Sequence, residues 1–337
     1  MEAYRAPAWL VGGNAQTIWP ALFSRQFDGS APVFRRERWA TPDGDFIDVD
    51  HSAPANLRDR PGPPDSPGPQ MAAVPLLVLF HGLEGSSASH SSLAFADAAR
   101  RLGWAFAVPH FRGCSGELNL APRAYHSADF EEIGWILARL RSSHAGPIAA
   151  VGISLGGNAL LRWAEEAGDT ATKSVSAVAA VSSPVDLMAS GLAIGRGFNR
   201  HTYTRMFLRS MKPKALRKWA QHPGLFDRER LRAARNLYEF DDVFTAPLHG
   251  FRNADDYWTR GSAKPQLASI RIPALVLNAR NDPFVPAESL PGPRQAGRHV
   301  TLWQPAHGGH VGFASGRWPG HVKAMPQQVA AWLMPRL

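Results

Sequence analysis

The chain has 337 residues, of which 45% are apolar, a net charge of +9 and a single cysteine, Cys114. This length and apolar content favour one domain, residues 1–337, over two independent domains, and one cysteine excludes an intrachain disulfide. The sequence has no N-terminal signal peptide and no run of about 18 apolar residues, so we expect a soluble, cytoplasmic protein.

Two short strands open the expected sheet. Residues 33–40 and 46–50 flank the turn sequence T-P-D-G-D, which predicts an antiparallel hairpin. Residues 52–75 then contain seven prolines. We interpret this stretch as a mobile surface loop, because strands of the sheet continue after it.

From residue 76 onward, short apolar strands alternate with amphipathic helices. This alternation predicts a mostly parallel sheet covered by helices on both faces, an α/β fold. The expected strands are residues 76–80, 105–111, 147–152 and 175–183, the helices between them are residues 91–101, 128–141 and 157–167, and further strands follow at 274–280 and 299–303.

The segment of about residues 187–265 interrupts this alternation after the sixth strand. It is helical in character and rich in aromatic residues, which favours a cap whose inner face forms the apolar wall of an acyl pocket. Aromatic side chains that merely pack on the core are the alternative. Between Asp186 and Asp227 the segment has no carboxylate but eight basic residues: Arg196, Arg200, Arg205, Arg209, Lys212, Lys214, Arg217 and Lys218. No nucleic-acid-binding motif accompanies them, so we expect no nucleic-acid partner.

The sequence Gly-Ile-Ser-Leu-Gly at 152–156 lies between an expected strand and an expected helix. This is the pattern of a nucleophile elbow, in which glycines two residues before and after the serine allow strand and helix to approach closely. We therefore predict that Ser154 is a nucleophile. A turn in which the serine only caps the helix is the alternative.

A serine nucleophile needs a base and an acid that orients the base. Asp282 directly follows the strand-like residues 274–280 and is favoured as the acid over Glu288, which lies farther along a proline-rich loop. After the last expected strand, His310 follows two glycines and is ranked first as the base, with His307 second. The two histidines could instead form part of a metal site, but neither a cysteine nor a carboxylate cluster stands beside them to complete one.

Backbone N–H groups must also stabilise the oxyanion that forms on the substrate. In an elbow of this kind, one comes from the residue after the nucleophile and one from the loop after the third strand. These positions are Leu155 and Leu83. We expect the neighbouring His81 and Glu84 to be structural.

Several motifs together resemble the YheT-like branch of the α/β-hydrolases, which is related to the ABHD-type lipases. They are LVLFHGLEGSS, PHFRGCSGE, VGISLGGNALL, LNARNDPFVP and HGGHVGF, with NAQTIWPAL near the amino terminus and FDDVFTAPLHGF in the central segment. The resemblance implies the α/β-hydrolase fold with a helical cap, and assigns the nucleophile, acid and base to Ser154, Asp282 and His310. The sequence departs from the family pattern at His110, where asparagine is expected, and at Asn281, where aspartate is frequent.

These observations predict a serine hydrolase that acts on small-molecule or lipid esters through an acyl-enzyme, with no cofactor and no metal. An acyltransferase that passes a medium-chain acyl group to an alcohol with the same residues is the first alternative. The second is a peripheral lipid-binding module, since residues 200–218 are basic and aromatic enough for weak membrane contact. Met211-Lys212-Pro213 is expected to interrupt a helix there.

Overall fold

The computed structural model describes residues 4–53 and 74–337, so most of the expected proline-rich loop at 52–75 lies outside the described residues. Eight strands form one sheet in the order β1-β2-β4-β3-β5-β6-β7-β8. The β1–β2 hairpin and the β2–β4 pair are antiparallel, and every other pair is parallel. The strands are β1 (Arg35–Ala40), β2 (Phe46–Ser52), β3 (Leu76–Phe80), β4 (Ala105–Pro109), β5 (Ile148–Ile153), β6 (Ala177–Val181), β7 (Ala274–Leu277) and β8 (Val300–Trp303).

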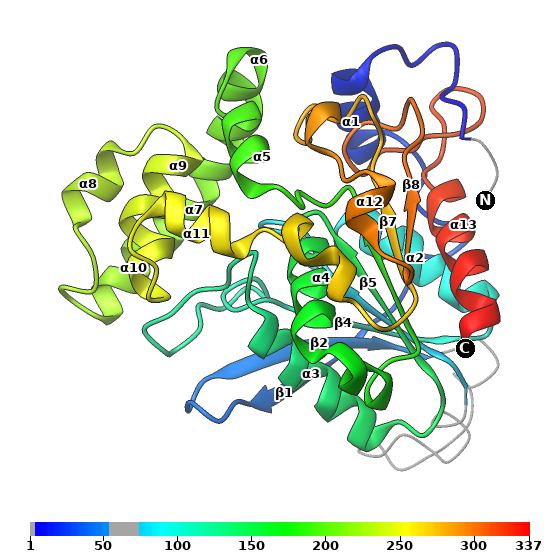
Figure 1. Cartoon of the computed structure of the whole chain (residues 1–337), viewed down its shortest axis with the longest axis horizontal. Helices are drawn as coiled ribbons and strands as arrows, with labels where there is room; N and C mark the ends of the chain where they lie inside the picture. Colours follow the sequence, from blue (N-terminus) through cyan, green and yellow to red (C-terminus); the bar gives the residue numbers. More distant parts are fainter. Residues whose placement is uncertain (1–3, 54–73) are drawn as a thin grey trace.

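Helices cover the two faces of this sheet (Figure 1). Alternate residues of a strand point to opposite faces, and in β3 Val78 packs in one apolar cluster while Leu77 and Leu79 pack in another. The Val78 cluster includes residues of α3 (Phe130–Ser143) and α4 (Leu155–Ala167), and the other includes residues of α2 (His90–Arg101) and α13 (Ala324–Leu333). Burial on both faces explains why the central strands are apolar throughout.

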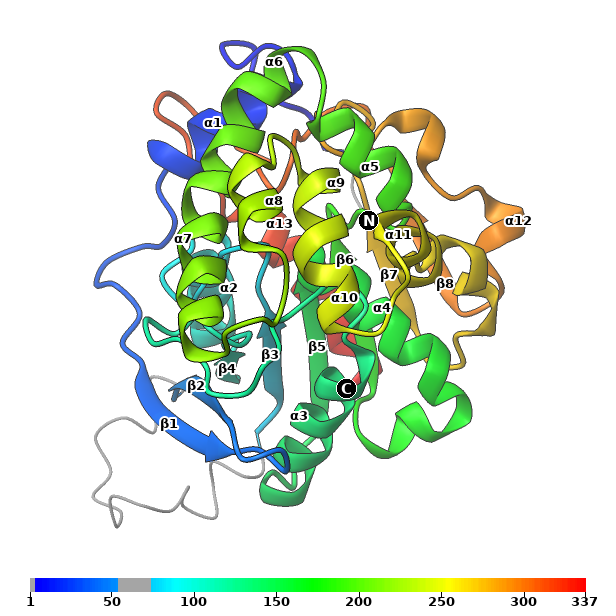
Figure 2. The same cartoon turned by 90° about the vertical axis from the view of Figure 1, so that its left-hand side faces the viewer.

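A helical insertion separates β6 from β7 and has its own small apolar core, which includes Phe226, Leu231 and Phe244. Figure 2 shows its helices on the near side, in front of the sheet. The insertion comprises α5 (Leu187–Ile194), α6 (Gly197–Asn199), η3 (Arg200–Thr204), α7 (Arg205–Gln221), α8 (Arg228–Ala233), α9 (Leu237–Phe240), η4 (Asp241–Thr245), α10 (Ala246–Leu248), α11 (Ala254–Gly261) and η5 (Lys264–Ser269). The predicted fold, with a helical cap after the sixth strand, is confirmed.

Two local features differ from the sequence-based expectations. Helix α7 continues through Pro213, so the expected interruption at Met211-Lys212-Pro213 is wrong. A helix that was not expected, α1 (Gly13–Leu22), packs near the carboxyl-terminal part of the chain, where Trp19 donates its indole N–H to the carbonyl oxygen of Pro319 at 2.9 Å.

Four further short helices complete the description: η2 (Gly168–Lys173), η6 (Ala287–Ser289), α12 (Pro293–Ala296) and η7 (Met334–Arg336). Within residues 4–53 and 74–337, no helix has the length and apolarity that crossing a bilayer requires.

Candidate active site

Ser154 lies at the turn between β5 and α4. Its backbone has φ +50° and ψ −117°, a conformation that few non-glycine residues adopt and that is characteristic of strained functional turns. The turn is fixed on both sides, because the Ser154 N–H donates to Val181 O at 2.8 Å and Ser154 O accepts the Gly157 N–H at 2.9 Å. The hydroxyl of Ser154 is thereby held outside the helix that follows it.

The two glycines of the elbow are required by close backbone contacts. A Cβ atom on Gly152 would lie 2.4 Å from the carbonyl oxygen of Gly156, and a Cβ on Gly156 would lie 2.4 Å from the carbonyl oxygen of Phe80. Both contacts are with backbone atoms, which cannot move aside as a side chain can. The motif therefore packs α4 directly against the ends of β3 and β5.

The structure brings Ser154, His310 and Asp282 together. The Nε2 atom of His310 is 2.9 Å from Ser154 Oγ, and its Nδ1 atom is 2.8 Å from Asp282 Oδ2. Asp282 is buried, and its second oxygen accepts the backbone N–H groups of Phe284 and Val285 at 2.8 and 3.3 Å. The carboxylate is thus held by its own turn while it accepts the N–H of the imidazole.

Helix α1 holds the loop that carries His310. This role of α1 was not predicted from the sequence. The hydroxyl of Thr17 accepts the backbone N–H of His310 at 2.8 Å, and the side-chain oxygen of Gln16 accepts the N–H of Gly308 at 2.9 Å. At Gly309, where φ is +60°, a Cβ atom would lie 2.6 Å from the backbone of Gln16. Gly309 therefore lets the loop approach α1 closely, whereas a Cβ atom on Gly308 would meet Phe313 and Ala279.

Neither Asn281 nor His307 belongs to the group formed by Ser154, His310 and Asp282. Asn281 donates to Gln16 Oε1 at 2.9 Å and accepts the Gly309 N–H at 3.0 Å, so it also holds the His310 loop. His307 is exposed, with its Nδ1 3.5 Å from Asn281 Nδ2. Ser154 is thus contacted by His310, whereas the second-ranked histidine lies next to Asn281.

Leu83 and Leu155 both line the same pocket as Ser154. Leu155 is the first residue of α4, where a helix leaves its N–H groups without an intrahelical acceptor. Within residues 4–53 and 74–337, neither Leu83 nor Leu155 donates its N–H to a protein group. These are the donors that an oxyanion next to Ser154 would need.

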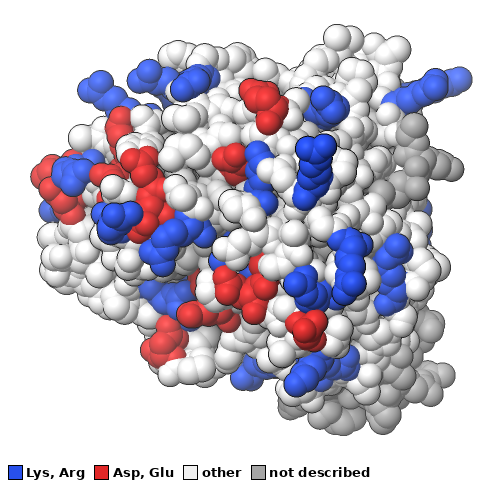
Figure 3. Space-filling model, in the orientation of Figure 1, with Lys and Arg blue, Asp and Glu red and all other residues white. Residues whose placement is uncertain are grey.

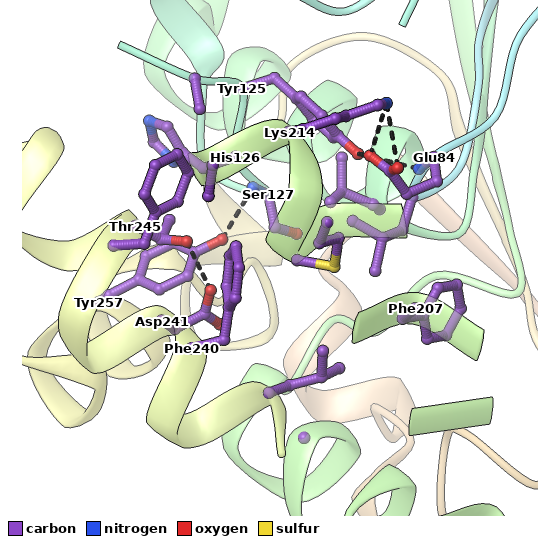
Figure 4. A pocket seen from close by; sticks show the side chains of 18 of the residues that line it. Glu84, Tyr125, His126, Ser127, Phe207, Lys214, Phe240, Asp241, Thr245 and Tyr257 are labelled. Atoms are coloured by element: carbon purple, nitrogen blue, oxygen red, sulfur yellow. Dashed lines mark hydrogen bonds and ion pairs between the residues drawn. The ribbon is translucent and has the colours of Figure 1, made fainter. Parts of the chain in front are cut away.

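The loop after β3 is held by a hydrogen-bonded cluster. Tyr125 accepts the N–H of Glu84 and donates to its carboxylate, each at 2.9 Å, and Lys214 of α7 lies 3.0 Å from the same carboxylate (Figure 4). His81 donates to Gly82 O at 2.8 Å and accepts the Phe111 N–H at 3.1 Å, and burial lowers its pKa to about 3. His81 is therefore neutral and, like Glu84, supports the loop that carries Leu83.

A cavity of about 150 Å³ opens beside Ser154, between the strand ends and the insertion. Its walls are mainly apolar and come from both parts of the chain, with Leu118 and Ala124 from the sheet side and Phe207, Met211 and Phe240 from the insertion. A pocket of this kind can bury the hydrocarbon part of a substrate.

One wall of this cavity is polar. Asp241 accepts the indole N–H of Trp258 at 2.8 Å and the hydroxyl of Thr245 at 2.5 Å, and burial raises its pKa to about 6. The buried hydroxyls of Ser127 and Ser190 also line the cavity, and neither has a hydrogen-bond partner in the part of the chain that the structure describes. Phe240, Asp241, Phe244 and Thr245 of the motif FDDVFTAPLHGF thus line the pocket.

His110, which departs from the family pattern, and Cys114, the single cysteine, follow β4, and both are structural. His110 is buried, with its Nε2 2.9 Å from Asp50 Oδ2. Cys114 lies 3.9 Å from the Lys214 ammonium, but burial raises the pKa of its thiol to about 12. A thiol with such a pKa carries little thiolate at neutral pH and is a poor nucleophile.

Part of the positive charge of the insertion faces inward. Lys218 is buried and donates to the carbonyl oxygens of Asn119 and Ala121, and burial lowers its pKa to about 8. Lys214 is paired with Glu84. On the face drawn in Figure 3, basic and acidic side chains are interspersed at the left, where Figure 1 places the insertion. Inward-facing lysines therefore attach α7 to the rest of the molecule.

Comparison with known proteins agrees with this architecture. A model described as the alpha/beta hydrolase fold matches residues 75–316. "Putative esterase YheT" of Escherichia coli (strain K12) is 38% identical over 325 residues, which cover 95% of this chain and 89% of that protein. Phospholipase ABHD3 of Mus musculus is 29% identical over 325 residues, which cover 94% of this chain and 75% of that protein.

A solved structure supports the fold alone. Est1E from Butyrivibrio proteoclasticus with bound ferulic acid superimposes with a TM-score of 0.53 at 14% identity, covering 89% of this chain and 98% of that chain. The elbow, the eight-stranded sheet and the insertion after β6 are thus accompanied by sequence similarity over nearly the whole chain. The chain belongs to the α/β-hydrolase family, in the YheT-like branch that is related to ABHD3.

Proposed function

We propose that this protein hydrolyses carboxylic esters, with Ser154 as nucleophile, His310 as general base and acid, and Asp282 as the group that orients His310. One observation carries the proposal. The Ser154 hydroxyl, both imidazole nitrogens of His310 and the Asp282 carboxylate form one continuous chain, with contacts of 2.9 and 2.8 Å. This series of hydrogen bonds lets a neutral serine act as a nucleophile at neutral pH.

In the first half-reaction, Ser154 Oγ attacks the ester carbonyl carbon while its proton passes to His310 Nε2. The carbonyl π electrons move to oxygen, and the N–H groups of Leu83 and Leu155 stabilise the resulting oxyanion. Asp282 stabilises the imidazolium through Nδ1–H. The tetrahedral intermediate then reforms the carbonyl, the bond to the leaving alcohol breaks, and that oxygen takes the proton from Nε2.

In the second half-reaction, water replaces the alcohol. His310 Nε2 removes a proton as the water oxygen attacks the acyl carbon, and the second tetrahedral intermediate expels Ser154 Oγ, which recovers the proton. The products are a carboxylic acid and free enzyme. Every proton in the cycle passes through Nε2 of His310, from Ser154 to the leaving alcohol and then from water back to Ser154.

The substrate class follows from the cavity and from the relatives. The mainly apolar walls favour an ester with a hydrocarbon acyl group, and the relatives are named as an esterase and a phospholipase. We propose a small-molecule or lipid ester, bound between the strand ends and a cap of about residues 187–265 in a single domain, 1–337. A cytoplasmic location stays a prediction.

Labelling with a fluorophosphonate followed by peptide mass spectrometry tests the nucleophile. We expect the label on Ser154 and its loss in Ser154→Ala, with p-nitrophenyl ester turnover reduced by about 10³-fold or more. Ser190→Ala is the matched control, because Ser190 also lines the cavity but its hydroxyl has no hydrogen-bond partner, and so no base, among residues 4–53 and 74–337. Labelling of another serine, or undiminished turnover by Ser154→Ala, would overturn the assignment.

Product analysis distinguishes hydrolysis from acyl transfer, which the same three residues could perform. With an acyl thioester and ethanol together, hydrolysis yields the free acid and transfer yields an ethyl ester. We expect the acid to predominate. A predominance of ethyl ester would reassign the protein as an acyltransferase while leaving the roles of Ser154, His310 and Asp282 unchanged.

A further inference from the structure

Large apolar side chains gather on the surface around α1. We call this group the aromatic surface and define it as Trp9, Trp19, Leu22, Phe23 and Trp318. The side chains of Leu22, Phe23 and Trp318 are 66%, 56% and 69% exposed. Single exposed apolar residues are common on soluble proteins, but a contiguous group of them usually marks an interaction site.

The rings of the aromatic surface are held in place. Trp19 lies at the centre, with ring centroids 5.8 Å from Trp9, 4.7 Å from Phe23 and 6.2 Å from Trp318. The indole N–H groups of Trp9 and Trp19 donate to the carbonyl oxygens of Gly316 and Pro319 at 3.1 and 2.9 Å. The surface is therefore a fixed part of the fold, built from α1 and the loop at 315–320.

The segments that form this surface carry only positive charge. Residues 4–27 and 289–337 contain no aspartate or glutamate. Arg5, Arg25 and Arg317 are exposed, and Arg25 and Arg317 lie within two residues of Phe23 and Trp318 in the chain. Asp28, at the border, lies within 3.0 Å of both Lys323 and Arg101, so its charge is compensated. The aromatic surface thus combines exposed rings with arginines that form no salt bridge with any residue in the ranges 4–53 and 74–337.

The same helix connects this surface to the site. The buried side of α1 carries Gln16 and Thr17, which hold the His310 loop, while Leu22 and Phe23 lie on its exposed side and end. Tyr203 of the cap donates its hydroxyl to Asn14 of α1 at 3.0 Å, and Figure 2 shows α1 and α6 close together at the top. A body that bound the exposed side of α1 would lie next to both the cap and the catalytic loop.

We propose that the aromatic surface docks this protein on an anionic lipid surface. Tryptophan and phenylalanine with arginine suit the boundary between lipid headgroups and acyl chains, where rings enter the apolar layer and guanidinium groups meet phosphates. A second copy of the chain is the poorer occupant, because a symmetric contact would bring two surfaces without carboxylates together. This docking differs from contact through the basic residues 200–218, of which Lys214 and Lys218 face inward.

Co-sedimentation with vesicles of ether-linked lipids tests the proposal, since such lipids contain no ester that the enzyme could cleave. We expect the parent protein to bind dialkyl phosphatidylcholine weakly, and to bind more tightly when dialkyl phosphatidylglycerol is mixed in. Phe23→Ser and Trp318→Ser should each reduce the partition coefficient about tenfold, the loss expected for one apolar side chain. Arg25→Gln should reduce binding to the anionic vesicles alone, about fivefold.

Leu120→Ser is the matched control, because Leu120 lies outside the aromatic surface and, like Phe23, is 56% exposed. It should leave vesicle binding unchanged, and all these variants should retain the turnover of a soluble p-nitrophenyl ester, so that docking is judged separately from catalysis. Equal binding by the Phe23→Ser and Leu120→Ser proteins would overturn the proposal, as would the absence of vesicle binding by the parent. A lipid-independent dimer that Trp318→Ser dissociates would assign the surface to a second copy and also overturn it.

Discussion

At the scale of single residues, Asp241 is a carboxyl group in the wall of a mainly apolar cavity. Its two hydrogen-bond donors, Thr245 and Trp258, favour the ionised form, but burial outweighs them and raises the pKa from 3.8 to about 6. A buried carboxyl with a raised pKa is common at functional sites, and it gives this pocket a polar wall that changes charge near pH 6.

The raised pKa predicts how stability depends on pH. Between about pH 4 and about pH 6 the unfolded chain loses the Asp241 proton while the folded protein keeps it, so the free energy of unfolding falls as pH rises. The fall amounts to about 3 kcal/mol and is complete above the folded pKa. Asp241→Asn should abolish this contribution. Urea unfolding of both proteins across this range measures it, and titration of other groups, such as His81, cancels in the difference. A difference that does not vary with pH would contradict the prediction.

At the scale of elements, α1 supports the catalytic loop from outside the sheet. It contributes no side chain to the reaction, yet Thr17 and Gln16 accept the backbone N–H groups of His310 and Gly308. Thr17 also donates its hydroxyl to Gly13 O at 2.7 Å, so its oxygen is fixed in the direction of His310. The helix therefore acts as a positioning element for the proposed base.

Thr17→Val tests this role, because valine matches threonine in shape but cannot accept the His310 N–H. Leaving that buried N–H without a partner should displace the loop and lower kcat about tenfold, with KM changed less than about twofold. Steady-state kinetics with a soluble ester measures both constants. Thr202→Val is the control, because the Thr202 hydroxyl likewise donates to a carbonyl oxygen four residues earlier, that of Phe198 at 2.8 Å, but among the described residues it accepts no N–H from the His310 loop. Lower stability with an unchanged kcat would show that α1 is merely structural.

At the scale of the whole molecule, the sheet places the ends of β3 and β5 side by side, because these strands pair in parallel from Leu76 with Ile148 to Phe80 with Gly152. The loop that carries Leu83 and the elbow that carries Ser154 therefore leave the sheet together. Helix α4 starts at this junction, where position 156 leaves no room for a side chain. Leu83 and Ser154 lie in segments about 70 residues apart in the sequence, and only the strand order brings these segments together.

Gly156→Ala should disrupt this junction. The new methyl group would meet the carbonyl oxygens of Phe80 and His81 at 2.4 and 2.5 Å, and we expect about 3 kcal/mol of destabilisation with loss of turnover. Gly292→Ala is the matched control, because a Cβ atom there meets no heavy atom within 4 Å. Urea unfolding of both variants measures the effect, and equal stability of the two would refute the packing argument.

The sequence by itself predicted the strands, the fold class and the place of the cap, selected Ser154 and Asp282, and ranked His310 above His307. These features depend on local patterns: apolar runs between turns, glycines at fixed spacing, and the order of residues after successive strands. They can be recognised without knowing which distant segments meet.

Only the tertiary structure decided which residues support that site. The bonds from Thr17 and Gln16 to the His310 loop join residues separated by 293 and 292 positions. Both residues lie in the motif NAQTIWPAL, but nothing in that motif indicates that they contact the His310 loop. Asn281 likewise holds the His310 loop, and it also forms a hydrogen bond with Gln16 of α1. The path of that loop brings His310, and not His307, next to Ser154. Such contacts depend on how the packed elements meet, and no local pattern records them.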